Sequence, residues 1–213
     1  MHNPVDGYLG IAALSRLVTA VDYGTRRLTL VRQKPKTDLS TAVDKTAKGA
    51  PDSIEVRPGV DIPVRTTSSG FLSGEVTIDG INKPLNFIID TGATVTVLSE
   101  RAAATEEAVG FIQDHRMRVF GAAGITDDVK TAVLPKIAIG SYTREKVNAA
   151  VLNLEPINET AGFQQSGILG GNFLRHFRVV FDFQRAIVRL EPLEFANAPK
   201  DSMPWETTTQ GKP

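Results

Sequence analysis

The most constraining feature of this sequence is an aspartate that directly follows a short apolar run. The segment FIIDTGATVTVLSE places three apolar residues before Asp90, and the chain then turns through Thr91, Gly92 and Ala93. A carboxylate at the end of a buried strand costs free energy unless it is hydrogen-bonded or has a function. Gly92 allows a tight turn whose N–H groups can reach that carboxylate, and the Thr91 hydroxyl can anchor the loop. The alternative interpretation is an ordinary turn aspartate.

Composition narrows the chemistry that can surround this loop. The chain has 213 residues, of which 41% are hydrophobic, and this suits one globular domain with tails or two very small domains. It contains no cysteine, which excludes a disulfide scaffold, a thiolate nucleophile and thiolate-bound zinc or iron–sulfur sites. Its three histidines, His2, His115 and His176, share no helical spacing, so a histidine-rich metal site is not expected.

Charge and hydropathy limit the partners. The 24 Lys and Arg residues balance the 24 Asp and Glu residues, so no net field favours nucleic acid. No apolar run approaches the roughly 20 residues that a membrane span needs. The first residues lack a basic segment and do not resemble a signal peptide. We expect a soluble protein of undetermined location; a bacterial periplasmic or exported location would require a signal upstream of this chain.

Alternation of apolar and polar residues predicts a mainly β domain. Residues 72–89 and residues 178–192 each show the pattern of a hairpin. Ser99 is the expected N-cap of a helix that ends before Gly110, and a helical turn is expected at residues 172–176. These elements predict a small closed barrel or a sandwich with one or two short helices.

The sequence also contains an internal repeat. Residues 7–30 align without gaps with residues 167–190, at a constant offset of 160. The identical positions are Gly7, Leu9, Gly10, Leu14, Asp22 and Leu30, matched by Gly167, Leu169, Gly170, Leu174, Asp182 and Leu190. Chance recurrence of glycine and leucine is the alternative, but the shared order of strand, glycine, helical turn and hairpin favours a repeat.

The repeat and the polar composition of residues 32–52 predict the domain organisation. Residues 1–31 are expected to be the C-terminal half of an upstream copy of the main domain. Residues 32–65 are expected to form a linker and a lead-in strand, residues 66–192 the main domain and residues 193–213 a tail.

The Asp90 loop resembles the active-site loop of the clan AA aspartic proteases, specifically the single-domain retropepsin-like branch with many bacterial members. In that family a glycine-containing hairpin flap follows the loop, and an apolar–apolar–Gly strand then packs behind it. The flap is matched here by Phe120, Gly121, Ala122, Ala123, Gly124 and Ile125, and the second element by Ile168, Leu169 and Gly170. The resemblance covers residues 66–192 and implies a retropepsin-like closed β-barrel. An exposed turn is the alternative for the flap residues.

Two positions depart from the retroviral members of this family. Those members usually carry an aspartate where this chain has Thr94, and an arginine where it has Gly171. The two charges form a pair that stabilises the viral dimer. Their absence puts the viral dimer geometry in doubt for this chain.

The resemblance implies an aspartic endopeptidase with Asp90 as a catalytic residue and Thr91, Gly92 and Ala93 as its loop. Such hydrolysis uses a water held between two aspartates that share one proton. The chain holds a single Asp-Thr-Gly, so the resemblance implies that a homodimer or an upstream domain supplies the second one. Residues 120–125 would cover a peptide or protein substrate bound as an added strand. No metal or organic cofactor is implied.

Two alternative functions remain open from the sequence. The barrel could be a non-catalytic peptide-binding module without a competent pair of aspartates. It could be a plain structural β domain, which would leave the buried strand-end carboxylate of Asp90 unexplained. Asp182, which follows an apolar strand, is read as a strand-end or hairpin aspartate rather than a second catalytic carboxylate.

Overall fold

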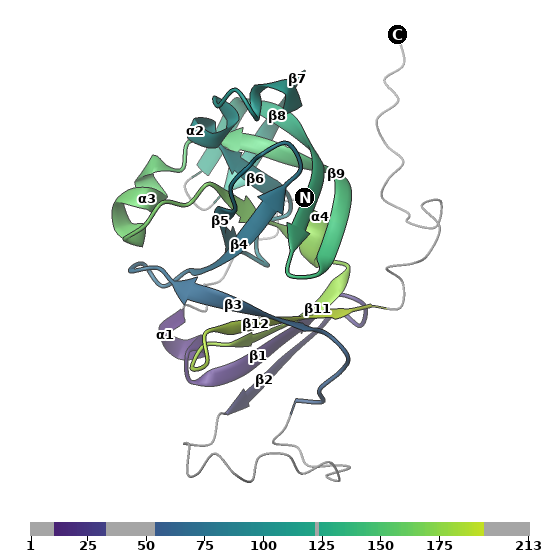
Figure 1. Ribbon diagram of the computed structural model, residues 1–213. Coiled ribbons are helices and arrows are strands. Elements are labelled where there is room, and N and C mark those ends of the chain that lie inside the picture. The colour runs from purple at the N-terminus through teal and green to yellow at the C-terminus, as the bar shows by residue number, and fades with distance from the viewer. Residues whose placement is uncertain (1–10, 33–53, 122–123, 194–213) are drawn as a thin grey trace.

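Short strands connected by tight turns and short helices make up the structure (Figure 1). The computed structural model describes residues 11–32, 54–121 and 124–193. The strands are β1 Leu17–Asp22, β2 Arg27–Arg32, β3 Val60–Thr66, β4 Leu72–Ile78, β5 Leu85–Ile89, β6 Thr96–Ser99, β7 Ile112–Gly121, β8 Gly124–Ile139, β9 Tyr142–Leu152, β10 Gly167–Leu169, β11 Phe177–Asp182 and β12 Ile187–Pro192. The predicted mainly β class is confirmed.

The helices are brief. They are α1 Ile11–Leu14, α2 Glu100–Ala103, α3 Glu155–Ala161 and α4 Gly171–Leu174, with a 3-10 turn at Val109–Phe111. The Ser99 hydroxyl accepts the N–H of Ala102 at 3.1 Å, so the predicted N-cap is confirmed. The predicted helix to Gly110 is wrong, because α2 stops at Ala103 and Gly110 lies in the 3-10 turn. Since α3 was not expected, the prediction of one or two helices is too low for residues 66–192.

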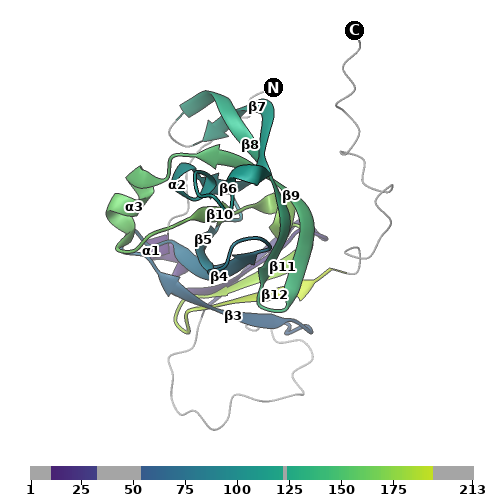
Figure 2. The ribbon, with the colours of Figure 1, turned by 45° about the horizontal axis from the view of Figure 1, so that its top comes forward.

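The strands are hydrogen-bonded in the order β2-β1-β11-β12-β3-β4-β5-β10-β6-β9-β8-β7. β3 joins two parts of this sheet: residues Val60–Pro63 pair with β12, and Val64–Thr66 pair with β4. Figures 1 and 2 show the strands β2, β1, β11, β12 and β3 as a layer below the remaining strands. We call these five strands the base sheet.

The upper strands come close to forming a ring. β8 pairs with β9 and also with β4, through Thr77 opposite Ala138 and Ile78 opposite Ile137. The pairing order therefore returns from β8 to β4, although the complete sheet still has free ends at β2 and β7 among the described residues. The mainly β fold is established, and full closure of the barrel stays a prediction.

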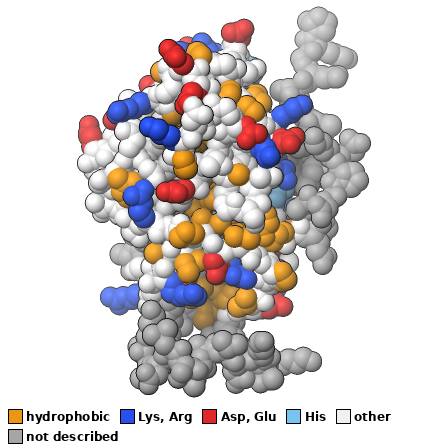
Figure 3. All heavy atoms as spheres, viewed as in Figure 1, with side chains coloured by type: hydrophobic (Ala, Val, Ile, Leu, Met, Phe, Trp, Pro, Cys, Tyr) orange, Lys and Arg blue, Asp and Glu red, His pale blue; other side chains and the backbone are white. Residues whose placement is uncertain are grey.

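One large apolar core lies between the base sheet and the upper strands. It takes residues from nearly every strand and from α4, and Phe87, Phe173 and Leu190 within it are completely buried. The rings of Phe173 and Phe177 stack with centroids 5.7 Å apart. Figure 3 shows hydrophobic side chains gathered on the lower half of the surface, over the strands of the base sheet. Leu28 and Leu30 on β2 are 57% and 42% exposed, so the core does not cover all of that sheet.

The two segments of the sequence repeat have the same backbone. α1, β1 and β2 correspond to α4, β11 and β12 at an offset of 160 in every element boundary. Both hairpin turns contain a residue with positive φ, Arg26 at 54° and Ala186 at 52°. Asp22 accepts the N–H of Thr25 and Asp182 that of Arg185, each at 3.0 Å. Asp182 is thus a hairpin aspartate, as predicted.

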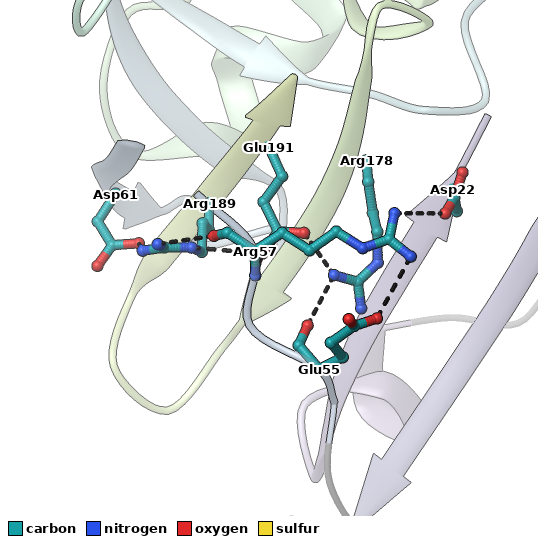
Figure 4. Close-up of polar contacts among 7 residues, drawn as sticks. All are labelled: Asp22, Glu55, Arg57, Asp61, Arg178, Arg189 and Glu191. Atoms are coloured by element: carbon teal, nitrogen blue, oxygen red, sulfur yellow. Dashed lines mark hydrogen bonds and ion pairs between the residues drawn. The ribbon is translucent and has the colours of Figure 1, made fainter. Parts of the chain in front are cut away.

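A network of charged side chains ties residues 54–57 to the base sheet (Figure 4). Arg178 and Glu191, directly opposite each other on β11 and β12, form a buried ion pair. Arg57 bonds to Asp22 at 3.2 Å, and its N–H donates to Glu191 at 3.2 Å. The complete network consists of Asp22, Glu55, Arg57, Asp61, Arg178, Arg189 and Glu191. It holds the chain before β3 against β1, β11 and β12.

Several sequence predictions fall outside the described residues. These are residues 1–10 of the expected upstream remnant, most of the expected linker (residues 33–53), and the tail from residue 194 onward. The domain boundaries stay predictions. No helix of the described chain is long and apolar enough to cross a membrane.

Candidate active site

Asp90 lies where the buried strand β5 ends and the chain turns. Phe87–Ile89 are buried, whereas Asp90 is only partly covered and Gly92 is exposed. The Gly92 N–H donates to Asp90 Oδ1 at 2.8 Å, and the Asp90 N–H donates to the carbonyl of Leu169 at 3.1 Å. The buried residues before Asp90 thus fix its backbone, and the Gly92 N–H holds its carboxylate at the surface.

The second predicted element packs directly behind this loop. β10, which contains Ile168 and Leu169, lies between β5, with which it is parallel, and β6, with which it is antiparallel. The Gly171 N–H donates to the carbonyl of Ala93 at 2.7 Å. The sequence therefore grouped the Asp90 loop with residues 168–170 correctly in space.

Gly170 occupies a position where no side chain fits. A Cβ atom there would lie 2.5 Å from the backbone carbonyl carbon and oxygen of Val95. At Gly92 the only neighbour of an added Cβ is Asp90 Oδ1, at 3.1 Å, and that carboxylate can move. A side chain at Gly170 would displace backbone, whereas one at Gly92 would displace the carboxylate itself.

Asn172, which the sequence placed in the helical turn after Gly170 without a role in the site, supports the loop from below. Asn172 Oδ1 accepts the N–H of Thr96 at 2.9 Å and the Thr96 hydroxyl at 2.7 Å, and its amide donates to the carbonyl of Asn148 at 2.6 Å. The Thr96 hydroxyl in turn accepts the Gly170 N–H at 3.3 Å. One side chain therefore links α4, β6 and β9 beneath the turn. Its place just after Gly170 was a signal that the sequence offered.

Tyr23 reaches the loop from the β1–β2 turn. Its hydroxyl donates to the backbone carbonyl of Thr91 at 3.2 Å. Burial raises the pKa of the Tyr23 phenol, and the negative charge of Asp90 raises it further. The phenol therefore remains protonated and keeps its donor role. No local pattern predicts this contact, because the two residues are 68 positions apart in the sequence.

The predicted flap residues form a hairpin tip. Phe120 pairs with Ile125, and Gly121 with Gly124, at the end where β7 meets β8. Phe120 and Ile125 are 59% and 60% exposed, which is unusual for large apolar side chains. Ala122 and Ala123 lie outside the described residues. The hairpin that a flap needs is present, and its role over Asp90 stays a prediction.

No group of acidic, histidine or cysteine side chains suited to a metal ion occurs in the described parts of the chain. What the arrangement offers instead is one loop carboxylate with a fixed backbone donor and an accessible face. A single carboxylate of this kind can accept a proton from water or hydrogen-bond a substrate. Activating water for attack on an amide needs a second acid group nearby.

Comparison with known proteins bears on the same segment. Residues 74–173 match the model of the family described as aspartyl protease. A comparison with curated proteins gives no match. Among solved structures, the chain is similar to a retropepsin-like aspartic protease from Rickettsia conorii, at 19% identity and a TM-score of 0.42 over 62% of this chain and 89% of that one. The segment that carries Asp90, Gly170 and Asn172 is therefore the part of the chain that is similar to the aspartyl proteases.

Proposed function

We propose that this protein is an aspartic endopeptidase and that Asp90 is one of its two catalytic carboxylates. The observation that carries the proposal is the fixed carboxylate of Asp90, which accepts the Gly92 N–H at the accessible end of a buried strand. Thr91, Gly92 and Ala93 position it, and residues 168–170 support it from behind. The match of residues 74–173 to the aspartyl protease family favours the same chemistry.

The proposed reaction is direct attack of water on a peptide carbonyl. One carboxylate of the pair removes a proton from the water, and the water oxygen bonds to the carbonyl carbon. At the same time the other carboxyl group protonates the carbonyl oxygen, which gives a gem-diol. The C–N bond then breaks as the amine takes a proton from the pair, and one hydroxyl of the gem-diol returns its proton to the pair as the carboxyl group forms. Like charges about 3 Å apart cannot both ionise, so the pair titrates as a unit and shares one proton.

The second carboxylate comes from another Asp-Thr-Gly loop, either in a second copy of the chain or in an upstream lobe. An extended peptide would bind as an added strand between the loops and the β7–β8 hairpin. The exposed side chains of Phe120 and Ile125 would then contact apolar side chains of the substrate. In this proposal the pairing of β4 with β8 closes the barrel that carries the loop and the hairpin.

A non-catalytic peptide-binding module is the second candidate, because the described chain holds one such loop. The two functions differ in the separation of the two loop carboxylates in the assembled protein. Carboxylates within reach of a shared water support hydrolysis, and carboxylates far apart support binding alone.

The test is cleavage of a peptide library between pH 3 and pH 8. The protein is assayed together with the source of its second aspartate, which is either a second copy of the chain or an upstream lobe. Asp90→Asn should lose several orders of magnitude in rate with little change in stability, because the amide keeps the shape but cannot exchange the shared proton. Asp79→Asn is the matched control, since Asp79 is exposed in the turn between β4 and β5 and belongs to neither the loop nor the β7–β8 hairpin. Equal turnover by Asp90→Asn and Asp79→Asn would refute the proposed role of Asp90.

A further inference from the structure

We propose that the β1–β2 hairpin is the end of a second retropepsin-like lobe that precedes Ile11 in the same polypeptide. This lobe, rather than a second copy of the chain, would supply the aspartate that partners Asp90. The inference rests on the proposed function only for the role of that aspartate. The arrangement itself follows from the base sheet.

The base sheet has a local twofold axis between its two hairpins. β1 and β11 are antiparallel, and Ala20 lies opposite Val180, which is its own equivalent at offset 160. The pair Val18–Asp182 is interchanged with the pair Arg178–Asp22 by the same symmetry. The β1–β2 hairpin therefore sits where the β11–β12 hairpin of a symmetric partner would sit.

This placement leaves no room for a homodimer of the same geometry. A second copy would have to pair its own β11 with the edge of β11, about the position of Val180. That edge already bonds to β1 over Val18–Asp22. The partner's place in the sheet is filled by the chain itself.

Burial shows what the β1–β2 hairpin lacks. Leu28 and Leu30 on β2 are 57% and 42% exposed, whereas their equivalents on β12, Val188 and Leu190, are completely buried. The strand register puts all four on one face of the sheet, because Leu28 follows Val21, Val179 and Leu190 across the strands, and Leu30 follows Thr19, Phe181 and Val188. The same face is buried on β12 and about half exposed at these two residues of β2.

The covered end identifies the missing occupant. β12 is flanked by β3 on its outer edge, and its core face is packed by the upper strands and α4. Within the described residues, β2 has no strand on its outer edge. The occupant that fits is one strand like β3 together with a core like that of the upper strands, which is a second lobe of this fold.

Tyr23 shows that such a lobe would bring its loop to Asp90. Tyr23, from the β1–β2 hairpin, bonds to the loop of the opposite lobe at Thr91. Its equivalent, Phe183, would face the loop of the second lobe in the same way. Each hairpin thus reaches across the axis to the other lobe's loop, so the two loops lie on either side of that axis.

The experiment builds the missing lobe from the chain's own sequence. Because Gly171 corresponds to Ile11, residues 54–170 placed directly before Ile11 give a tandem chain with two Asp-Thr-Gly loops. We expect a monomer by light scattering that cleaves peptides about 100-fold or more faster than the original chain, at a rate proportional to concentration. Asp→Asn in either loop should abolish this gain.

Two further results separate the lobe arrangement from the proposed function. A folded monomer in which β2 becomes protected from hydrogen exchange, but which cleaves nothing, would support the lobe and refute the endopeptidase. A folded tandem chain with β2 as exposed as before would overturn the lobe.

The original chain gives a test that does not depend on folding of the tandem chain. If the original chain cleaves peptides at all, the Asp90-dependent rate should not rise with the square of the protein concentration, as it would for a homodimer. The variant Leu28→Glu should have the same stability as the original chain. A homodimer with such second-order cleavage, or marked destabilisation by Leu28→Glu, would overturn the proposal.

Discussion

The hairpins β1–β2 and β11–β12 have the same backbone and opposite surroundings. Their strands, turns and turn hydrogen bonds coincide at an offset of 160 residues, yet Leu190 is completely buried and Leu30 is 42% exposed. The difference shows that the hairpin is specified locally, by the strand pattern and by the Asp that caps its turn. Burial is specified from outside, by the strand and core that only one hairpin has.

The largest expected effect concerns a buried ion pair that the β1–β2 hairpin lacks. Arg178 and Glu191 are opposite each other and buried, whereas their equivalents are Val18 and Val31. Glu191→Val alone should cost about 3–5 kcal/mol of unfolding free energy, because it leaves Arg178 buried and unpaired. The double change Arg178→Val with Glu191→Val, which copies the β1–β2 hairpin, should recover most of that loss. Chemical denaturation measures both, and a double variant as unstable as the single one would contradict this account.

Truncation of the equivalent residues Leu190 and Leu30 tests the difference in burial between the two hairpins most simply. Leu190→Ala removes a completely buried side chain from the core and should cost about 2–5 kcal/mol. Leu30→Ala, at the equivalent position, should cost less than about 0.5 kcal/mol in the same denaturation experiment. Equal losses at the two positions would mean that β2 is covered as well as β12 is.

His176 gives the β11–β12 side a pH dependence that the other side lacks, since its equivalent is Arg16. Burial, together with the positive charges of Arg144 and Arg175, lowers the pKa of His176 from 6.5 to about 4. The unfolded chain therefore takes up this proton at higher pH than the folded chain does. Unfolding free energy should fall between pH 6.5 and pH 4 by no more than about 3 kcal/mol from this group.

The check is the pH slope of stability in His176→Gln, measured by denaturation at steps of pH. The slope between pH 6.5 and pH 4 should flatten in the variant. An unchanged slope would show that other groups dominate the acid response.

The smallest effect is expected at Tyr23, where the other hairpin has Phe183. Tyr23→Phe makes the two turns alike and removes the hydrogen bond to Thr91. Stability should fall by about 1 kcal/mol, the usual net contribution of one such bond. In the tandem chain, the rate of cleavage should fall with little change in KM if the bond positions the Asp90 loop. A change in KM alone would point to substrate contact instead.

Local patterns predicted the elements near Asp90 well. The β4–β5 hairpin, the loop at residues 90–93, the Ser99 cap and the helical turn after Gly170 all depend on neighbours in sequence. The helix after Ser99 was overestimated, because its alanine-rich residues have helix propensity but the chain turns at Ala104. α3 was missed because its polar sequence, with Pro156 in the first turn, has no apolar periodicity.

Contacts between distant segments could not be predicted. The bond from Tyr23 to Thr91 depends on β1 pairing with β11, which brings an N-terminal turn to the loop. The role of Asn172 depends on β6 and β9 meeting at its side chain. The repeat was the one long-range signal in the sequence. It predicted the β1–β2 hairpin from the β11–β12 hairpin, but it did not predict that the two hairpins would pair.

The most direct test of the central claim, that one hairpin has its lobe and the other lacks it, is hydrogen exchange in the chain itself. Amides of β12, between β11 and β3, should exchange slowly. Amides of β2, with one neighbouring strand and an uncovered face, should exchange at least about 100-fold faster. If instead β2 is as protected as β12 in a monomeric chain, its surface is already covered, and the account is contradicted.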